Sequence, residues 1–263
     1  MSASAIIADV RALLTGEPVF LAGSLVACDT YGKGDAYHDV DLFCPTGNVL
    51  VHVVTKLQHS GFTFPENFER VWYRWLRYGF KTWHTNSIRM LSPQGVEYNV
   101  VYKTTDGHAT TSLSQVLESF DFGLLATGYD LETDQFLDLR SYLFPQHMAQ
   151  YTNGEPLPMM PNKRANWRQG FISQYNGIRE GGRYAKYHAY GYDMSLVKDD
   201  LVTGYREAAL HWVDSFDKEK QLLGQIFETI GDYIETDDID GLNAASKKIE
   251  YKSPLEAILE ALE

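Results

Sequence analysis

Apolar side chains in the first 145 residues change between the period of a helix and the period of a strand. Residues 6–14 place them at helical spacing, and the glycine and proline of TGEP end that pattern. The short apolar run VFLA, which closes on Gly23 and Ser24, predicts a strand followed by a tight turn. Residues 25–35 then predict a short helix or turn and a glycine-rich loop, and the run DVDLFC predicts a second strand.

The segments after the second strand continue this alternation. NVLVHVVTKLQHSG predicts a helix that ends at Gly61, because its apolar residues recur at helical intervals. VEYNVVYK and the segment before SPQG predict a β-hairpin with a Pro-Gln-Gly turn. SLSQVLESF predicts an amphipathic helix capped by Ser112 or Ser114, and DFGLLATGYDLETDQFLDL predicts two strands joined by an acidic turn.

The pattern beyond about residue 145 is different, because long polar stretches there carry apolar residues at helical spacing. It is clearest in TGYREAALHWVDSF, KQLLGQIFETIGDYI and PLEAILEAL. The sequence contains no internal repeat and no low-complexity segment. We therefore predict an α/β (α+β) domain with a mixed sheet at residues 1–145, followed by an all-α domain at residues 146–263.

Composition narrows the classes of protein to which the chain can belong. With 263 residues and 44% hydrophobic content, it can bury a proper core. The formal net charge of -12 argues against non-specific coating of duplex nucleic acid, which needs a basic surface, but leaves room for a local basic groove. The two cysteines, Cys28 and Cys44, predict neither a disulfide framework nor a cysteine-based zinc site, and we expect both to be reduced.

The sequence carries no sign of a membrane or export segment. The amino terminus MSASAIIADVRALLTGEP lacks the basic flank and the long apolar centre of a signal peptide. No later segment has an uninterrupted apolar run long enough to span a bilayer. We therefore expect a cytoplasmic protein without a membrane partner.

Two aspartates interrupt the second apolar run, and their spacing places them on one face of the predicted strand. Successive side chains of a strand point to opposite faces, so Asp39 and Asp41 share one face while Val40 takes the other. Two like charges held side by side repel each other unless a cation lies between them, and a divalent metal is the usual one. Asp39 and Asp41 are therefore the predicted metal ligands, against the alternative of two solvated acids on an edge strand.

The order helix, strand, Gly-Ser, turn and Asp-x-Asp strand resembles the DNA polymerase β nucleotidyltransferase superfamily. In that pattern a Gly-Ser or Gly-Gly pair precedes an acidic pair around one apolar residue. Here Gly23 and Ser24 precede Asp39 and Asp41, with fourteen residues between the two pairs. The resemblance covers about residues 1–145. It implies a nucleotidyltransferase fold in which Asp39 and Asp41 bind Mg²⁺ or Mn²⁺, and in which Gly23 and Ser24 bind the phosphates of a nucleoside triphosphate (NTP).

These residue types suit that chemistry on physical grounds. Nucleotidyl transfer gathers a triphosphate and a hydroxyl group against strong negative charge, and paired Mg²⁺ ions about 4 Å apart can bridge the attacking and leaving oxygens. A backbone amide and a hydroxyl group at a tight turn form an anion site, which a helix beginning there would strengthen. One half of the motif is therefore expected to bind phosphate and the other half to bind metal.

The superfamily usually adds a third carboxylate on a neighbouring strand, and this chain departs from the pattern there. The best match is VEYNVVYK, in which Asn99 stands at the expected place, although an amide neither supplies the charge nor acts as a general base. Glu97 on the same strand and Asp121 in SFDFGLLATGYD are the candidate substitutes, and we favour Asp121. The stretch around Asp121 also resembles CCA-adding tRNA nucleotidyltransferases and related phage or viral proteins.

A local excess of basic residues stands out between residues 163 and 187 of this acidic chain. We expect Lys163, Arg183 and Lys186 to contact the triphosphate or a polynucleotide, against the alternative of a solvated helix face. The sequence RYAKYHAYGY also resembles an Arg-x-x-Lys-Tyr motif of the same phage-like proteins. An aromatic group is predicted to pack in the core rather than to stack on bases: Trp72, Tyr73, Trp75, Tyr78, Phe80 and Trp83.

These features predict a metal-dependent nucleotidyltransferase with Asp39, Asp41 and Asp121 as its catalytic residues. It would move a nucleoside monophosphate from an NTP to a hydroxyl group of a tRNA or RNA end, a protein or a small molecule. A first rival is a catalytically weak or inactive member that binds a nucleotide, an RNA or a protein, and Asn99 favours it. A second rival is a phosphotransferase or toxin-type enzyme that uses the same metal pair on another donor.

Overall fold

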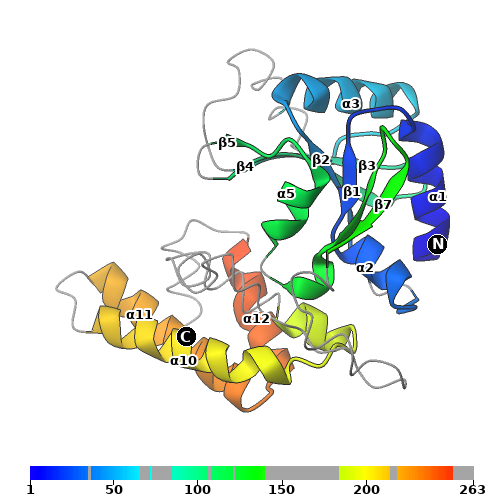
Figure 1. The fold of residues 1–263 in the computed structure, drawn as a ribbon. Helices are drawn as coiled ribbons and strands as arrows, with labels where there is room; N and C mark the ends of the chain where they lie inside the picture. Colours follow the sequence, from blue (N-terminus) through cyan, green and yellow to red (C-terminus); the bar gives the residue numbers. More distant parts are fainter. Residues whose placement is uncertain are drawn as a thin grey trace. The chain divides into compact units, whose positions relative to one another are not determined.

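The computed structural model describes residues 1–34, 37–65, 72, 85–105, 108–120, 122–139, 184–213 and 218–250. The chain divides into two compact units, residues 1–149 and residues 150–263. The sheet belongs to the first unit, and the described part of the second unit is helical (Figure 1). Among the described residues, no helix combines the length and the apolar content needed to cross a membrane.

Three helices form the amino-terminal part of the first unit, and two of them begin at a side-chain cap. The Ser2 hydroxyl accepts a hydrogen bond from the backbone N–H of Ala5 at 3.3 Å, and the Thr46 hydroxyl accepts one from Val49 at 3.2 Å. The predicted first and third helices are confirmed, and the segment after Gly23 is a helix rather than a turn. The helices are α1 (Ala3–Leu14), α2 (Ser24–Thr30) and α3 (Gly47–His59).

Six strands of the first unit form a mixed sheet in the order β3-β4-β2-β1-β6-β7. β2 and β4 are parallel, and every other neighbouring pair in this order is antiparallel. A two-residue strand, β5 (His108–Ala109), pairs with the end of β4. The six strands are β1 (Phe20–Ala22), β2 (Val40–Cys44), β3 (Thr85–Leu91), β4 (Glu97–Thr105), β6 (Thr127–Asp130) and β7 (Gln135–Asp138).

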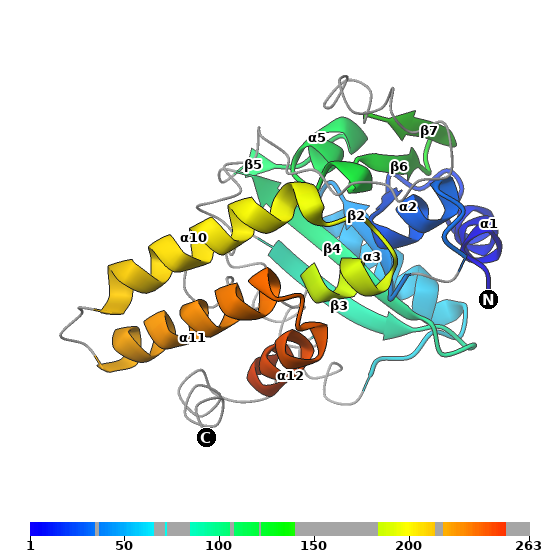
Figure 2. The same cartoon turned by 90° about the horizontal axis from the view of Figure 1, so that it is seen from below.

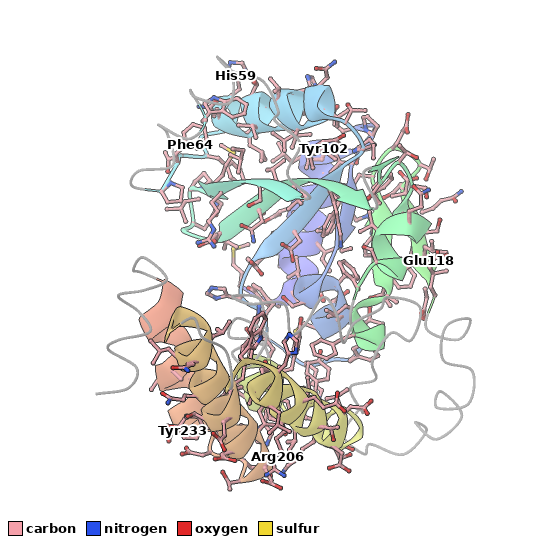
Figure 3. The ribbon with its side chains drawn as sticks, turned by 90° about the vertical axis from the view of Figure 1, so that its left-hand side faces the viewer. His59, Phe64, Tyr102, Glu118, Arg206 and Tyr233 are labelled. Atoms are coloured by element: carbon pink, nitrogen blue, oxygen red, sulfur yellow. The ribbon has the colours of Figure 1, made fainter. Side chains whose placement is uncertain are left out.

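The sheet separates two hydrophobic layers, one on each face. Val40, Leu42 and Val100 belong to the larger core, which the helices α1, α2 and α3 cover. Tyr102 of β4, labelled in Figure 3, is partly buried against this core. Helix α5 (Leu113–Glu118) covers part of the opposite face. There the α5 residues Leu113, Val116 and Leu117 pack with Phe20, Ala22, Phe43, Val101 and Ala126.

Local turn and cap signals correctly predicted the connections around β4. β3 and β4 form the predicted hairpin, and Gly95 in its turn has a φ of 80°, which favours glycine. Ser112 rather than Ser114 caps α5, because its hydroxyl accepts a hydrogen bond from the N–H of Gln115 at 3.3 Å. The two strands around the acidic turn are also found as β6 and β7.

One predicted strand is shorter than the sequence pattern indicated. The strand expected to begin at residues 121–122 begins only at Thr127, because the residues before it form the 3-10 helix η1 (Gly123–Leu125). Two backbone hydrogen bonds of 3.1 Å close this turn, and both Phe122 and Leu125 are buried. A short apolar run fits a buried turn as well as a buried strand, so its periodicity could not distinguish the two.

Several residues that were predicted to be structural are buried in the first unit. Cys28 and Cys44 are both buried and no disulfide joins them, as predicted, and burial raises the pKa of the Cys44 thiol. Trp72 is 4% exposed in the larger core, and its ring centroid lies 6.1 Å from that of Phe64. The other five members of the predicted aromatic group lie outside the described residues.

The described part of the second unit consists of a short helix at residues 184–189 and three longer helices. Figures 1 and 2 show α10 and α11 side by side. Tyr205 and Phe227 are fully buried, and their ring centroids lie 5.9 Å apart. Arg206, labelled in Figure 3, pairs across these helices with Glu235. The longer helices are α10 (Ser195–Val213), α11 (Lys218–Glu235) and α12 (Ile239–Glu250).

A helical carboxy-terminal region is therefore confirmed, with one helix that the sequence analysis did not single out. TGYREAALHWVDSF lies largely in α10 and KQLLGQIFETIGDYI lies in α11, whereas PLEAILEAL lies outside the described residues. The unpredicted helix is α12. Its start carries a recognisable signal, because the Asp238 carboxylate accepts a hydrogen bond from the N–H of Gly241 at 2.9 Å.

Candidate functional site

The end of β1 brings Gly23 against a carboxylate of the neighbouring strand. β1 and β2 pair with Ala22 opposite Asp41, so the residue after Ala22 lies beside the Asp41 side chain. Gly23 has a φ of 97°, a conformation that L side chains rarely adopt. A Cβ atom at Gly23 would lie 2.5 Å from Asp41 Oδ2. Both the backbone conformation and the approach of the Asp41 carboxylate therefore require glycine at this position.

Ser24 carries a hydroxyl group that is buried without a partner. It is the first residue of α2 and is 5% exposed, and its Oγ makes no hydrogen bond within the part of the chain that the structure describes. A buried hydroxyl group without a hydrogen bond destabilises the folded state by about 1–3 kcal/mol. A ligand that accepts a hydrogen bond from this Oγ would recover that free energy on binding.

Asp39 and Asp41 lie on one face of β2, as their spacing predicted. Asp39 immediately precedes the strand and Asp41 is its second residue, and both are half-buried. Val40 between them is fully buried in the larger core on the other face. Because a slip of one residue would turn Val40 out of that core, its burial fixes the direction of both carboxylates.

Asn99 of β4 connects the two carboxylates. The parallel pairing of β2 and β4 places Asp41 opposite Asn99. Asn99 Nδ2 donates a hydrogen bond to Asp39 Oδ2 at 2.5 Å and one to Asp41 Oδ1 at 3.3 Å. Asn99 Oδ1 is buried and accepts no hydrogen bond from any described residue. An amide thus lies beside the carboxylate pair, on the strand where the sequence resemblance calls for a third acid.

Glu97 and Arg89 lie on the same sheet face as Asn99. Arg89 of β3 pairs with Asn99, and Glu97 is two residues before Asn99 on β4. Arg89 Nε and Glu97 Oε1 lie 3.4 Å apart, with 51% and 27% of the two side chains exposed. An acid that faces a guanidinium group is less accessible to a metal ion or to an incoming hydroxyl group. This geometry therefore disfavours Glu97 as the third acid.

The polar cluster has the donor atoms that a hard cation prefers. Mg²⁺ and Mn²⁺ bind oxygen ligands, and Mg²⁺ sites usually combine one or two carboxylates with water and substrate phosphates. Asp39 and Asp41 supply two carboxylates, while no group of three or more His, Cys, Asp or Glu side chains in the described ranges could hold a metal. The two carboxylates therefore fit a cation that would take its remaining ligands from water or from a phosphate group.

Asp121, Lys163 and Arg183 lie outside the described residues. The residue before Asp121 is described, however. Phe120 packs edge-on against Phe43 with ring centroids 5.7 Å apart. Because Phe43 is two residues after Asp41 on β2, Phe120 packs on the face of the sheet that carries the carboxylates.

Lys186 belongs to the second unit, whereas Gly23, Ser24, Asp39 and Asp41 belong to the first. It lies half-buried in the short helix at residues 184–189, with Nζ 6.0 Å from the ring centroid of Tyr187 and 5.9 Å from that of Tyr190. These distances are at the outer limit of cation–π contacts. The ammonium group of Lys186 therefore lies near two aromatic rings of its own segment.

A second polar contact fixes the helix that carries Lys186. The Tyr184 hydroxyl donates a hydrogen bond to Asp237 Oδ1 at 3.2 Å, and Lys198 Nζ donates one to Asp237 Oδ2 at 2.6 Å. The hydrogen bond from Lys198 is the main cause that lowers the pKa of Asp237. This contact joins the short helix to the start of α10 and to the turn between α11 and α12.

Sequence reasoning missed Arg89 as a neighbour of the site. An isolated arginine in a strand carries no pattern of its own, and its position opposite Asn99 follows only from the register between β3 and β4. The hairpin itself was predicted. Counting back from its Pro-Gln-Gly turn is the signal that could have placed Arg89 near the carboxylates.

Comparison with known protein families finds no family model that matches the chain, and comparison with curated protein sequences finds no significant match. Neither comparison assigns a function. The geometry of the site and the resemblance of its motif are therefore the basis of the functional inference.

Proposed function

We propose that the protein is a metal-dependent nucleotidyltransferase, which transfers a nucleoside monophosphate from an NTP to a hydroxyl acceptor and releases pyrophosphate. The observation that carries this proposal is the fit of Gly23 against the Asp41 carboxylate, beside the buried and unpartnered hydroxyl group of Ser24. A tight turn with a free donor and a carboxylate pair are thereby held together by two paired strands. Nucleotidyl transfer needs both parts, one for phosphate and one for metal.

The order of elements in the first unit supports the proposal. The superfamily that the sequence resembles places a Gly-Ser pair at the end of one strand and the acidic pair on the next. Here α1, β1, α2 and β2 follow one another, with the Gly-Ser pair between β1 and α2. β2 lies between β1 and β4, so the phosphate turn and the third-acid position flank the carboxylates on opposite sides.

Gly23 and Ser24 would bind the phosphates of the NTP. Ser24 Oγ can donate its hydrogen to a phosphate oxygen, because no described residue accepts it. The missing side chain at Gly23 lets a phosphate approach the backbone N–H groups of the turn. A hydrogen bond to a charged group contributes about 1.5–3 kcal/mol, so the loss of one donor should be measurable.

Asp39 and Asp41 would hold Mg²⁺ or Mn²⁺. Such a cation, when bound, neutralises charge on the triphosphate and polarises its phosphoryl oxygens. The chain's own contribution is to hold the two carboxylates in place. Val40 anchors them from the opposite face, and Gly23 leaves room for the Asp41 carboxylate.

Asp121 is the proposed third acid, with the role of general base toward the incoming hydroxyl group. Phe120 packs on the face of β2 that carries Asp39 and Asp41, which supports this choice. Glu97 is the weaker candidate, because its carboxylate faces Arg89 at 3.4 Å. A general base must come within hydrogen-bonding reach of the proton that it removes.

The second unit would supply basic residues for the triphosphate or for a polynucleotide acceptor. Lys163, Arg183 and Lys186 are the proposed contacts. The net charge of -12 restricts any contact with nucleic acid to such a local basic surface. A tRNA or RNA end, a protein side chain and a small molecule all offer the hydroxyl group that the reaction requires.

A binding module without catalytic activity is the second candidate, and the geometry of Asn99 favours it. The amide that replaces the third acid donates hydrogen bonds to both carboxylates, so the site can keep its shape without a cation. Such a protein would bind a nucleotide, an RNA or a protein without transferring a group. Transfer activity in the Asn99→Asp variant, with none in the wild type, would support this second candidate.

Metal-dependent stabilisation by an NTP tests the proposed site. Mg²⁺ or Mn²⁺ together with an NTP should raise the melting temperature of the wild type, because a ligand that binds only the folded state stabilises it. The double variant Asp39→Asn with Asp41→Asn should lose this increase and stay folded. A control with the same change of charge is Asp9→Asn with Asp199→Asn, since both side chains are exposed on helices. An equal increase in the site variant and the control would refute the metal site.

A further inference from the structure

The carboxamide of Asn99 lies where it can donate hydrogen bonds to two carboxylates at once. Its Nδ2 is 2.5 Å from Asp39 Oδ2 and 3.3 Å from Asp41 Oδ1. Two like charges this close repel each other, and the two hydrogens on Nδ2 carry partial positive charge. A single side chain thus offsets part of the repulsion that a bound cation would offset more fully.

The orientation of this amide is the one that the carboxylates select. Asn99 Oδ1 is buried and has no hydrogen-bond donor among the described residues. A half-turn about the last side-chain bond would exchange Nδ2 with Oδ1 and set the carbonyl oxygen against two negative charges. The amide therefore keeps its donors on Asp39 and Asp41 although its own acceptor stays unpaired.

The geometry points to a built-in substitute for the cation: Asn99 holds Asp39 and Asp41 together in the metal-free protein, and a divalent cation must displace its N–H donors to bind. This inference rests on the proposed function, because it takes the carboxylate pair as the cation site. The site is consequently formed before metal arrives. Because the cation must break these hydrogen bonds, the site should bind it about tenfold or more weakly than a site without the Asn99 donors.

Two other roles for Asn99 can be separated from this one. If the carboxamide oxygen were needed as a metal ligand, an apolar side chain at this position would weaken cation binding. If the amide only stabilised the pairing of β2 and β4, an apolar side chain would lower stability equally with and without the cation. If Nδ2 competes with the cation, the same substitution destabilises the metal-free protein and strengthens cation binding.

Mn²⁺ binding to the full chain distinguishes these roles. Asn99→Leu removes the donors at similar size, and Asn99→Asp replaces them with a third carboxylate. We expect both variants to melt at a lower temperature than the wild type without Mn²⁺. Electron paramagnetic resonance of free Mn²⁺ should show about tenfold tighter binding for Asn99→Leu and still tighter binding for Asn99→Asp.

Val101→Ala is the matched control for general destabilisation. Val101 lies two residues further along β4 on the same face, and it is buried against α5 rather than beside the carboxylates. This variant should melt at a lower temperature with and without Mn²⁺, and its Mn²⁺ affinity should equal that of the wild type. It therefore shows what a loss of packing alone does to the measurement.

The outcomes separate a failure of this inference from a failure of the proposed function. Mn²⁺ binding by Asn99→Leu that is equal to or weaker than wild-type binding overturns the inference, while wild-type binding that requires Asp39 and Asp41 leaves the proposed site intact. No Mn²⁺ binding by the wild type, Asn99→Leu or Asn99→Asp overturns the inference, and if binding stays absent when an NTP is added, the proposed function is overturned as well. Should Asn99→Leu fail to fold, Asn99→Asp decides alone, and an affinity no higher than that of the wild type overturns the inference.

Discussion

On one face of the sheet, helix α5 covers one half, and the other half carries the polar side chains of the candidate site. The same strands, β2 and β4, run through both halves. Phe43 of β2 pairs with Val101 of β4, and both pack with α5. Two residues earlier on each strand, Asp41 pairs with Asn99 in the same register. The backbone pairing is continuous, so side-chain chemistry alone makes one pair a core contact and the other a candidate site.

The two halves also differ in how well their polar atoms are satisfied. Three buried side-chain oxygens of the described residues have no hydrogen-bond partner. One of them, Asn99 Oδ1, belongs to the amide that bonds to both carboxylates, and another, Ser24 Oγ, belongs to the residue after Gly23. Buried polar groups are normally paired, because leaving them unpaired lowers the stability of the fold. The unpaired oxygens therefore lower the stability of the fold, and one of them, Ser24 Oγ, is the atom to which the proposed ligand would bind.

Loss of the proposed third acid should have the largest effect on activity. Asp121→Asn should lower turnover by about 10²–10⁴-fold, because that is the usual contribution of a general base. Glu97→Gln should do little, since Glu97 already faces Arg89. Steady-state kinetics with an NTP measure both variants. The reverse result would assign the role to Glu97, and no change in either variant would show that neither residue is the acid.

Gly23→Ala should destabilise the fold more than the same change at Gly16. Both glycines have positive φ, 97° and 81°, so alanine should cost about 1–2 kcal/mol at each. A Cβ at Gly23 also meets Asp41 Oδ2 at 2.5 Å, whereas a Cβ at Gly16 meets nothing within 4 Å. Overpacking of this kind adds about 1–3 kcal/mol. Urea unfolding measures the difference, and equal losses would show that the carboxylate yields freely.

Ser24→Ala should separate binding from stability. The variant loses a hydroxyl group that no described residue pairs with, so the free energy of unfolding should stay the same or increase. NTP affinity measured by calorimetry should fall by about tenfold or more. Thr127→Val is the control, because it removes another buried hydroxyl group that has no partner among the described residues and should leave NTP affinity unchanged. Unaltered binding by Ser24→Ala would place the triphosphate elsewhere.

The smallest expected effect concerns the opposite face, where Glu17 bonds to α3. Lys56 Nζ lies 2.7 Å and His52 Nε2 3.0 Å from the two Glu17 oxygens, and the hydrogen bond from Lys56 is the main cause that lowers the pKa of Glu17. A carboxyl group with a lowered pKa stabilises the fold above its ordinary pKa, and this contribution disappears as the pH falls through the folded-state pKa.

Glu17→Gln should therefore melt at a lower temperature than the wild type near neutral pH, and the two should converge in acid. The difference in the free energy of unfolding should be at most about 1 kcal/mol, because Lys56 is partly exposed. Calorimetry from pH 7 to about pH 3 measures it, since that interval spans the carboxyl pKa. A difference that grows as the pH falls would contradict the assigned pKa shift. The variant should keep the NTP-dependent increase in melting temperature, because its change lies outside the site.

Local signals were sufficient to predict much of the first unit. The period of two placed Asp39 and Asp41 on one face and Val40 on the other, and the burial of Val40 follows from that alternation. Helical spacing with turn residues identified α1, α3 and α5. The strand expected from residue 121 was wrong at its start, because an apolar run does not distinguish η1 from a strand.

The contacts that give the site its character depend on the register between distant strands. Asn99 and Asp39 are sixty positions apart in the sequence, and only the parallel pairing of β2 with β4 brings them together. The resemblance of the sequence to a known motif predicted that Asn99 lies near the carboxylate pair. It did not predict that Asn99 donates hydrogen bonds to both carboxylates. The absence of a described partner for Ser24 Oγ is likewise a property of the folded structure and has no local signal.

The identity of the transferred group decides whether the site performs nucleotidyl transfer. The full chain can be incubated with Mg²⁺ or Mn²⁺, a total-cell mixture of acceptors, and each NTP radiolabelled at either the α- or the γ-phosphate. We predict that the α-label joins an acceptor, that the γ-label leaves in pyrophosphate, and that the Asp39→Asn, Asp41→Asn double variant transfers neither. Transfer of the γ-label, equal transfer by the double variant, or no transfer by the wild type would contradict the proposed function.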